Sequence, residues 1–166
     1  MLALVISDTH GNTVPLERLL KRFTKLDMVF HLGDVEHDED YIESLVYNRC
    51  HCPTLFVKGN MDFTSRQPLF QIVSWAGHRI YMTHGHTMNV GYDNDRLLQA
   101  AKENGADIAM FGHTHLPYLA TEDGIMLLNP GSLSKPRQEG WEPSYALLET
   151  DDKGKAYAVL CTLSLF

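Results

Sequence analysis

The residues of this chain most able to do chemistry are seven polar side chains of the types that bind divalent metal ions. They are Asp8, His10, Asp34, Asn60, His84, His113 and His115. Two pairs, Asp8 with His10 and His113 with His115, have the i, i+2 spacing that places both side chains on one side of an extended backbone. Carboxylate, amide and imidazole donors without cysteine suit Mn²⁺, Fe²⁺, Zn²⁺ or Ni²⁺. The pattern therefore predicts a metal site.

This set of donors is larger than one ion needs. Two ions that share a bridging carboxylate would use all seven, and such a pair, about 3.5–4 Å apart, activates water and supports in-line displacement at phosphorus. We expect two divalent ions, with Mn²⁺ as the first expectation and Ni²⁺, Zn²⁺ or Fe²⁺ as alternatives. Against two carboxylate ligands, two such ions leave a locally positive pocket that can receive phosphate.

Each donor follows an expected strand. The predicted strands are Leu2–Ser7, Met28–Leu32, Thr54–Lys58, Arg79–Thr83 and Asp107–Phe111. Helices are predicted after Pro15, over Glu39–Tyr47 and over Asp93–Asn104. Alternating strands and helices imply parallel pairing, and ligands bind beyond the carboxyl ends of strands in such sheets. The donors should therefore meet at one edge of the fold.

After residue 70 the pattern changes to antiparallel strands with one helix. Phe70–Trp75 and Arg79–Thr83 flank the turn Ala76-Gly77-His78. Two more hairpins are predicted, Tyr118–Thr121 with Ile125–Leu128, and Ser144–Thr150 with Lys155–Leu165. The chain has 166 residues and no linker or repeat, so we expect one domain over residues 1–166.

Composition narrows the classes of function. The formal net charge is −7, which disfavours long nucleic acids and anionic membranes as partners. The three cysteines are an odd number, so a disulfide framework is not expected. The apolar start lacks a basic region and is too short for a signal peptide, and no apolar run is long enough to span a membrane. We expect a cytoplasmic location.

The donors also form a recognisable series of motifs. In order they are Asp8-x-His10, Gly33-Asp34, Gly59-Asn60-x-Asp62, His84 and Gly112-His113-x-His115. This series resembles the signature of the calcineurin-like metallophosphoesterases. More narrowly, the chain length, Thr83-His84-Gly85-His86 and Asn129-Pro130-Gly131-Ser132 resemble the small YfcE-type phosphodiesterases.

The resemblance implies an α/β fold, a four-layer α/β/β/α sandwich of two mixed sheets. It also implies two ligand sets. One ion would be held by Asp8, His10, Asp34 and His115, and the other by Asp34, Asn60, His84 and His113. Asp34 would bridge the ions. The implied reaction is hydrolysis of small phosphodiesters by a metal-bound hydroxide, with Asp34, Asn60 and His86 as catalytic candidates.

One position departs from the wider superfamily, in which a histidine often follows the motif asparagine. Here that residue is Met61. YfcE-type members commonly lack this histidine too. We therefore expect a preference for leaving groups of low pKa, or a proton borrowed from another group, for which His86 is the nearest candidate.

Two interpretations are open for each of several polar residues. His86 either contacts substrate or supports a ligand, and Asp62 either supports a ligand or caps a loop. Arg137 either binds a substrate phosphate or is an ordinary surface residue. Among the other histidines, His31 is expected in the core. The surface is expected to hold His37, His51 and His78.

Two other classes of function are open. The retromer scaffold subunit resembles these phosphodiesterases and works mainly through protein contacts, so a catalytically weak scaffold is one alternative. The superfamily also contains nucleases, which the acidic balance disfavours. The partners expected are a small phosphodiester substrate and, as one alternative, further copies of the chain in a homo-oligomer.

Overall fold

The computed structural model describes residues 1–164, in which the chain forms ten strands and three helices. The strands are β1 (Leu2–Ile6), β2 (Met28–His31), β3 (Thr54–Phe56), β4 (Phe70–Trp75), β5 (His78–Thr83), β6 (Ile108–Met110), β7 (Pro117–Glu122), β8 (Ile125–Pro130), β9 (Ser144–Thr150) and β10 (Ala156–Thr162). The helices are α1 (Val14–Leu20), α2 (Glu39–Cys50) and α3 (Asp95–Glu103). No helix within residues 1–164 is long and apolar enough to cross a membrane.

The strands form two five-stranded mixed sheets. The first has the order β10-β9-β1-β2-β3, and the second has the order β4-β5-β6-β8-β7. Parallel pairs lie at the centre of each sheet, β1 with β2 and β6 with both β5 and β8. The three hairpins predicted after residue 70 are confirmed as antiparallel pairs, β4 with β5, β7 with β8 and β9 with β10. Helix α3 supplies the crossover that makes the pairing of β5 and β6 parallel.

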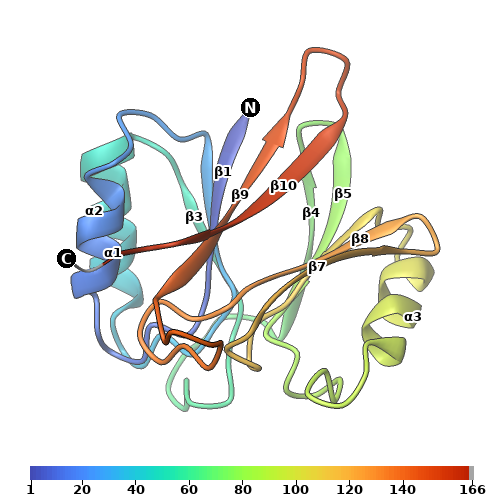
Figure 1. Cartoon of the computed structure of the whole chain (residues 1–166), viewed down its shortest axis with the longest axis horizontal. Coiled ribbons are helices and arrows are strands. Elements are labelled where there is room, and N and C mark those ends of the chain that lie inside the picture. Colours follow the sequence, from blue (N-terminus) through green and yellow to red (C-terminus); the bar gives the residue numbers. More distant parts are fainter. Residues whose placement is uncertain (165–166) are drawn as a thin grey trace.

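Three apolar cores separate four layers (Figure 1). Helices α1 and α2 cover the outer face of the first sheet, the two sheets face each other, and α3 covers the second sheet (Figure 1). Strand β1 contributes to two cores, because Leu4 and Ile6 face the helices whereas Ala3 and Val5 face the second sheet. The α/β/β/α sandwich is thus confirmed.

Element boundaries differ from the sequence predictions in a few places. Helix α2 continues past Tyr47 to Cys50. The additional turn places buried Cys50 on the apolar side of the helix. Ala76 and Gly77 both have positive φ and form a two-residue turn. His78, predicted in a loop, therefore lies in β5, paired with Trp75. Strand β10 ends at Thr162.

Other predictions concern the end of the last strand and three histidines. Leu165, predicted in the last strand, lies outside the described residues. His31 is buried in β2, as predicted, and burial lowers its pKa to about 4. His37 and His51 are exposed, as predicted.

A glycine allows the two sheets to approach each other closely. A Cβ atom on Gly112, which follows β6, would lie 2.1 Å from Ser7 Oγ and 3.0 Å from Asp8 Oδ2 at the end of β1. No side chain fits in this space unless β1 or β6 shifts. The backbone of Gly112 therefore packs directly against the side chains of Ser7 and Asp8 from the first sheet, within the predicted metal site.

Gly112→Ala should lower the free energy of unfolding by about 1–3 kcal/mol, because the added methyl group overpacks this contact. Chemical denaturation measures the change. Gly91→Ala is the matched control, since a Cβ atom there meets nothing within 4 Å. Equal stability of both variants and the original chain would contradict the close approach.

Candidate metal centre

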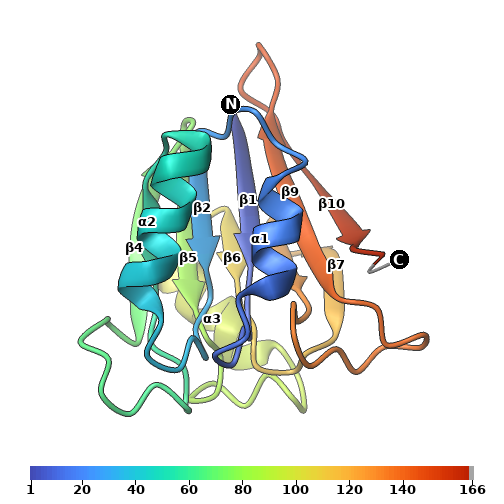
Figure 2. The same ribbon diagram turned by 90° about the vertical axis from the view of Figure 1, so that its left-hand side faces the viewer.

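All seven predicted ligands follow strands in the sequence, and the loops after β1, β2, β5 and β6 gather at one edge of the molecule (Figure 2). The first sheet supplies four of them, Asp8 and His10 after β1, Asp34 after β2 and Asn60 after β3. The second sheet supplies three, His84 after β5, and His113 and His115 after β6. Residues 105 positions apart in the chain thereby become neighbours.

The first group of donors comprises Asp8, His10, Asp34 and His115. One ligand atom from each lies within 4.8 Å of all the others. His115 Nε2 is 3.1 Å from Asp8 Oδ1 and 3.3 Å from His10 Nε2. Asp34 Oδ2 lies 3.8 Å from His10 Nε2. These separations suit four atoms arranged around one cation.

The second group surrounds His84. Its Nε2 lies 3.1 Å from Asn60 Oδ1 and 3.5 Å from Asp34 Oδ2. The ring of His113 stands edge-on to that of His84 at a centroid distance of 5.2 Å. The same Asp34 oxygen faces His10 in the first group and His84 in the second. Asp34 therefore lies where the bridging carboxylate was expected.

The imidazole rings are oriented by oxygen acceptors on their other nitrogen. Nδ1 of His10 lies 2.6 Å from Glu36 Oε1. Nδ1 of His84 lies 2.7 Å from the Leu32 carbonyl, and Nδ1 of His115 lies 2.6 Å from the Lys135 carbonyl. A carbonyl oxygen only accepts, so Nδ1 carries the proton in these bonds. Each Nε2 then offers its lone pair to the site, as in metal-ligating histidines.

The electrostatics of the site favour a cation. Burial alone would raise the pKa of Asp8, but His115 and His84 outweigh burial and lower it. Burial is likewise outweighed at Asp34, where His84 holds the pKa at about 2. Burial would lower the pKa of His84, yet Asp34 and Asp8 raise it. Two ionised carboxylates thus attract positive charge at His84 Nε2, which a proton or a metal ion can supply.

One atom of Asp8 tests the fit to a metal directly. Asp8 Oδ1 is fully buried and forms no hydrogen bond with any described residue, although His115 Nε2 is close to it. An unpaired buried carboxylate oxygen is costly. It fits an ion that would be coordinated by both Asp8 and His115. The residues present therefore suit a divalent metal.

Backbone conformation is unusual at the ligands themselves. Five of them have left-handed φ between 47° and 67°, namely Asp8, His10, Asp34, His113 and His115. Non-glycine residues rarely adopt this region, and each instance costs on the order of 1–3 kcal/mol. Hydrogen bonds between the strand ends hold the conformation, as in Asp8 N–H to the Gly33 carbonyl and His10 N–H to the Asp34 carbonyl. Such strain is common at functional sites.

Asp62 supports the loop that carries Asp34. Its carboxylate accepts hydrogen bonds of 2.7–2.8 Å from the backbone N–H groups of Asp34, Val35, Glu36 and Gly59. The Met61 N–H in turn donates to Asp34 Oδ1 at 2.8 Å. Asp62 therefore fixes backbone around the metal centre.

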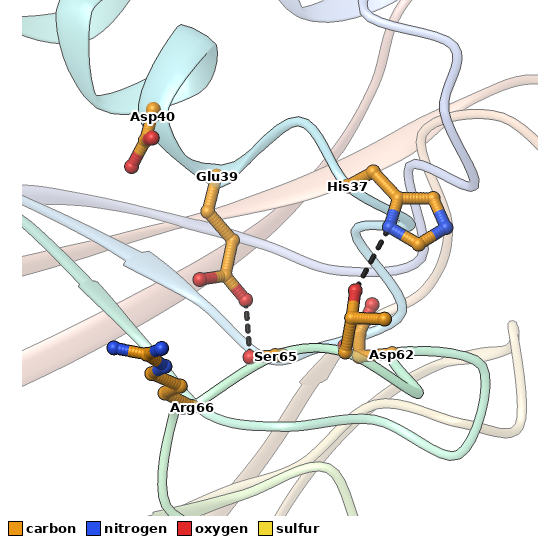
Figure 3. A pocket seen from close by; sticks show the side chains of 7 residues that line it. His37, Glu39, Asp40, Asp62, Ser65 and Arg66 are labelled. Carbon is orange, nitrogen blue, oxygen red and sulfur yellow. Dashed lines mark hydrogen bonds between the residues drawn. The ribbon is translucent and has the colours of Figure 1, made fainter.

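Asp62 also lines a hollow of about 250 Å³ between the start of α2 and the loop after β3 (Figure 3). Hydrogen bonds join His37 to Thr64 and Glu39 to Ser65 across it (Figure 3). Glu39, Asp40 and Asp62 give it an acidic lining, with Arg66 as a cationic neighbour. This hollow suits phosphate poorly.

Glu36 is a functional residue that the sequence analysis missed. Its carboxylate orients His10, and its side chain is 30% exposed. In the sequence Glu36 stands in the acidic run Glu36-His37-Asp38-Glu39-Asp40, so nothing distinguishes it from surface charge. Its positive φ of 60° also cannot be read from the sequence.

The remaining candidates lie at the border of the site. His86 is half-buried, with its ring 5.4 Å from that of His84 and 6.2 Å from that of His113. Its Nδ1 is buried and unpaired within residues 1–164. Arg137 is exposed, and its Nη1 lies 3.4 Å from the Thr114 carbonyl, between the two ligands His113 and His115.

Comparison with known proteins agrees with this geometry. A protein of Streptococcus pneumoniae TIGR4 described as a predicted phosphoesterase has a TM-score of 0.77 and 36% identity, covering 91% of this chain and 83% of its own. Phosphodiesterase YfcE of Escherichia coli K12 is 32% identical over 166 residues, covering 87% of this chain and 85% of its own length.

A third likeness concerns the fold alone. Zinc-complexed Vps29 of Entamoeba histolytica has a TM-score of 0.76 at 24% identity, covering 98% of this chain and 99% of its own. In addition, residues 1–153 match the calcineurin-like phosphoesterase superfamily domain. Together with the converging carboxylates and histidines, this match means that the chain belongs to the calcineurin-like phosphoesterase superfamily.

Proposed function

We propose that this chain is a phosphodiesterase that uses two divalent metal ions to hydrolyse small phosphodiesters, and that residues 1–166 act as one domain. The observation that carries the proposal is the convergence of His10, His84 and His115 Nε2 atoms on the carboxylates of Asp8 and Asp34. Without a cation or an added proton, these donors would hold lone pairs against one another at 3.1–3.3 Å. Two cations remove that conflict.

In the proposed site Asp8, His10, Asp34 and His115 hold one ion. The other is held by Asp34, Asn60, His84 and His113. The two distances from Asp34 Oδ2, 3.8 Å to His10 and 3.5 Å to His84, support its role as the bridge. Nitrogen and oxygen donors accept several metals, and Mn²⁺ is our first expectation, with Ni²⁺, Zn²⁺ and Fe²⁺ as alternatives.

Two divalent ions, when bound, supply activated water and offset the negative charge of the reacting phosphate. The chain positions the substrate. Burial, and then His84, lowers the pKa of His86, so its ring is neutral near pH 7 and can donate one N–H to a phosphate oxygen. Arg137 can bind a second oxygen through its planar guanidinium group. Asn60 and Asp34 complete the catalytic set.

The residue at position 61 supports a preference for good leaving groups. Met61 offers no proton to a leaving group, and its side chain is 38% exposed beside Asn60. Hydrolysis then favours esters whose leaving group departs as a stable anion. The phosphodiesterase name of the Escherichia coli relative supports a diester as the substrate.

The other classes of function find less support. The Vps29 fold draws attention to a protein-binding scaffold, but the identity to Vps29 is 24%, against 32% to the phosphodiesterase YfcE. A nuclease acting on long nucleic acid would need a basic surface, whereas the net charge is −7. We therefore favour the enzyme.

Asp34→Ala should lower kcat for bis(p-nitrophenyl) phosphate in Mn²⁺ by about 10³-fold or more, because both ions lose a ligand. Calorimetric titration with Mn²⁺ should show fewer than the two sites of the unmodified protein. The control is Asp152→Ala, at an exposed turn, which should match the original chain in both measurements. Full turnover by Asp34→Ala with bound metal would refute the assignment.

Met61→His should raise kcat/KM for diesters of poor leaving groups by about tenfold, since an imidazole there can donate a proton. A series of aryl diesters with leaving-group pKa from 7 to 10, an assay range of about three units, measures the effect as a shallower dependence on that pKa. An unchanged slope, or an equal loss of kcat/KM for all the diesters, would contradict the interpretation of Met61 as a missing acid.

Glu36→Gln should weaken Mn²⁺ binding by about 10–100-fold, because the His10 ring loses the carboxylate that orients it. Calorimetry gives the affinity without reference to turnover. Glu43→Gln, on the exposed face of α2, is the matched control. If the two variants bound Mn²⁺ equally well, Glu36 would have no part in the site.

A further inference from the structure

A second cavity adjoins the metal centre on the side of His113. It has a volume of about 590 Å³ and lies between the loop after β5, the end of β6 and the start of β7. His113 lines this cavity and also belongs to the proposed ligand set. Arg137 lines it as well. A phosphodiester held at the ions would therefore have one ester group close to this cavity.

The lining of the cavity is largely apolar and aromatic. It includes Val90, Tyr92, Phe111, Leu116 and Tyr118. The Phe111 and Tyr118 rings lie 6.1 Å apart at an angle of 58°, an arrangement typical of aromatic pairs. Apolar and aromatic walls with a few polar groups are typical of small-molecule sites.

Two of these side chains are left exposed. The side chain of Tyr92 is 89% exposed, and that of Leu116 is 44% exposed. Neither belongs to the three apolar cores among the described residues. A planar ligand entering the cavity would cover both and remove their apolar surface from water. Core packing does not account for them, whereas a bound aromatic group would.

The hollows around the site differ in chemistry. The hollow beside Asp62 has an acidic lining that would repel the phosphate and offers little apolar surface (Figure 3). The cavity beside His113 combines aromatic walls with the cation of Arg137, and Asp93 is the one carboxylate among the described residues of its lining. The backbone N–H of Arg137 donates to the His115 carbonyl, which holds the main chain of Arg137 next to His115. An aromatic group attached to an anion is therefore complementary to this side of the site.

We propose that the cavity beside His113 binds an aromatic ester group that stays on phosphorus while the other ester bond of a phosphodiester is hydrolysed at the metal centre. This inference rests on the proposed phosphodiesterase function and names its substrate class, diesters whose retained arm is a planar aryl or heteroaryl group. Arg137 binds the phosphate at the junction of cavity and metal centre. Tyr92 and Leu116 close over the ring.

The test compares two substrates that release the same p-nitrophenolate, phenyl p-nitrophenyl phosphate and ethyl p-nitrophenyl phosphate, in Mn²⁺. The ratio of their kcat/KM values is measured for each variant, so intrinsic reactivity cancels between variants. Tyr92→Ala and Leu116→Ala should each lower the phenyl-to-ethyl ratio by about 3–10-fold. Mn²⁺ binding by calorimetry should stay unchanged in both.

Leu119→Ala is the matched control, because Leu119 has a similar exposure of 40% but does not line the cavity. It should keep the original ratio within twofold. Equal losses on both substrates, or no loss in either cavity variant, would overturn the aromatic site while leaving the phosphodiesterase proposal intact.

If the original chain hydrolysed neither substrate, the proposed function would be wrong, and a binding measurement would then test the proposed aromatic site. The Mn²⁺-loaded protein would then be titrated with phenylphosphonate and with ethylphosphonate. Tighter binding of phenylphosphonate that is lost in Leu116→Ala supports the site. Equal affinities for the two phosphonates contradict it.

Discussion

The facing of imidazole nitrogens and ionised carboxylates is the constraint on which this structure depends. Glu36 and two backbone carbonyls accept hydrogen bonds from Nδ1 of His10, His84 and His115, so the three Nε2 atoms face Asp8 and Asp34. That arrangement stabilises a cation and little else. The close backbone contact at Gly112, the left-handed ligands and the buried Asp62 carboxylate all serve to keep those atoms together.

The fold supplies this arrangement through strand ends. Parallel strands at the centre of each sheet end at the same edge, and the two sheets face each other across one apolar core. Loops after β1, β2, β3, β5 and β6 therefore meet without any long excursion of the chain. Packing in the cores offsets the backbone strain at the ligands, which a smaller or looser domain could not sustain.

Much of this could be predicted from the sequence. Apolar runs that end in Asp-x-His or His-x-His mark buried strands and donors together, so β1, β6 and the ligand positions were predictable. Other features depend on three-dimensional contacts. Nothing in the sequence indicates that Glu36 contacts His10, because Glu36 stands in an acidic run. The parallel pairing of β6 could not be predicted either, because this strand has only three residues. The cavity beside His113 forms from segments that share no motif.

The division of the ligands between the two sheets has a thermodynamic consequence. In the unfolded chain only local pairs such as His113-x-His115 remain to attract an ion, whereas the folded chain brings seven donors together. Whatever binds the folded state more tightly than the unfolded state shifts the folding equilibrium by that difference in affinity. Ions placed for catalysis would thus also join one sheet to the other, and the population of folded molecules would follow the supply of metal.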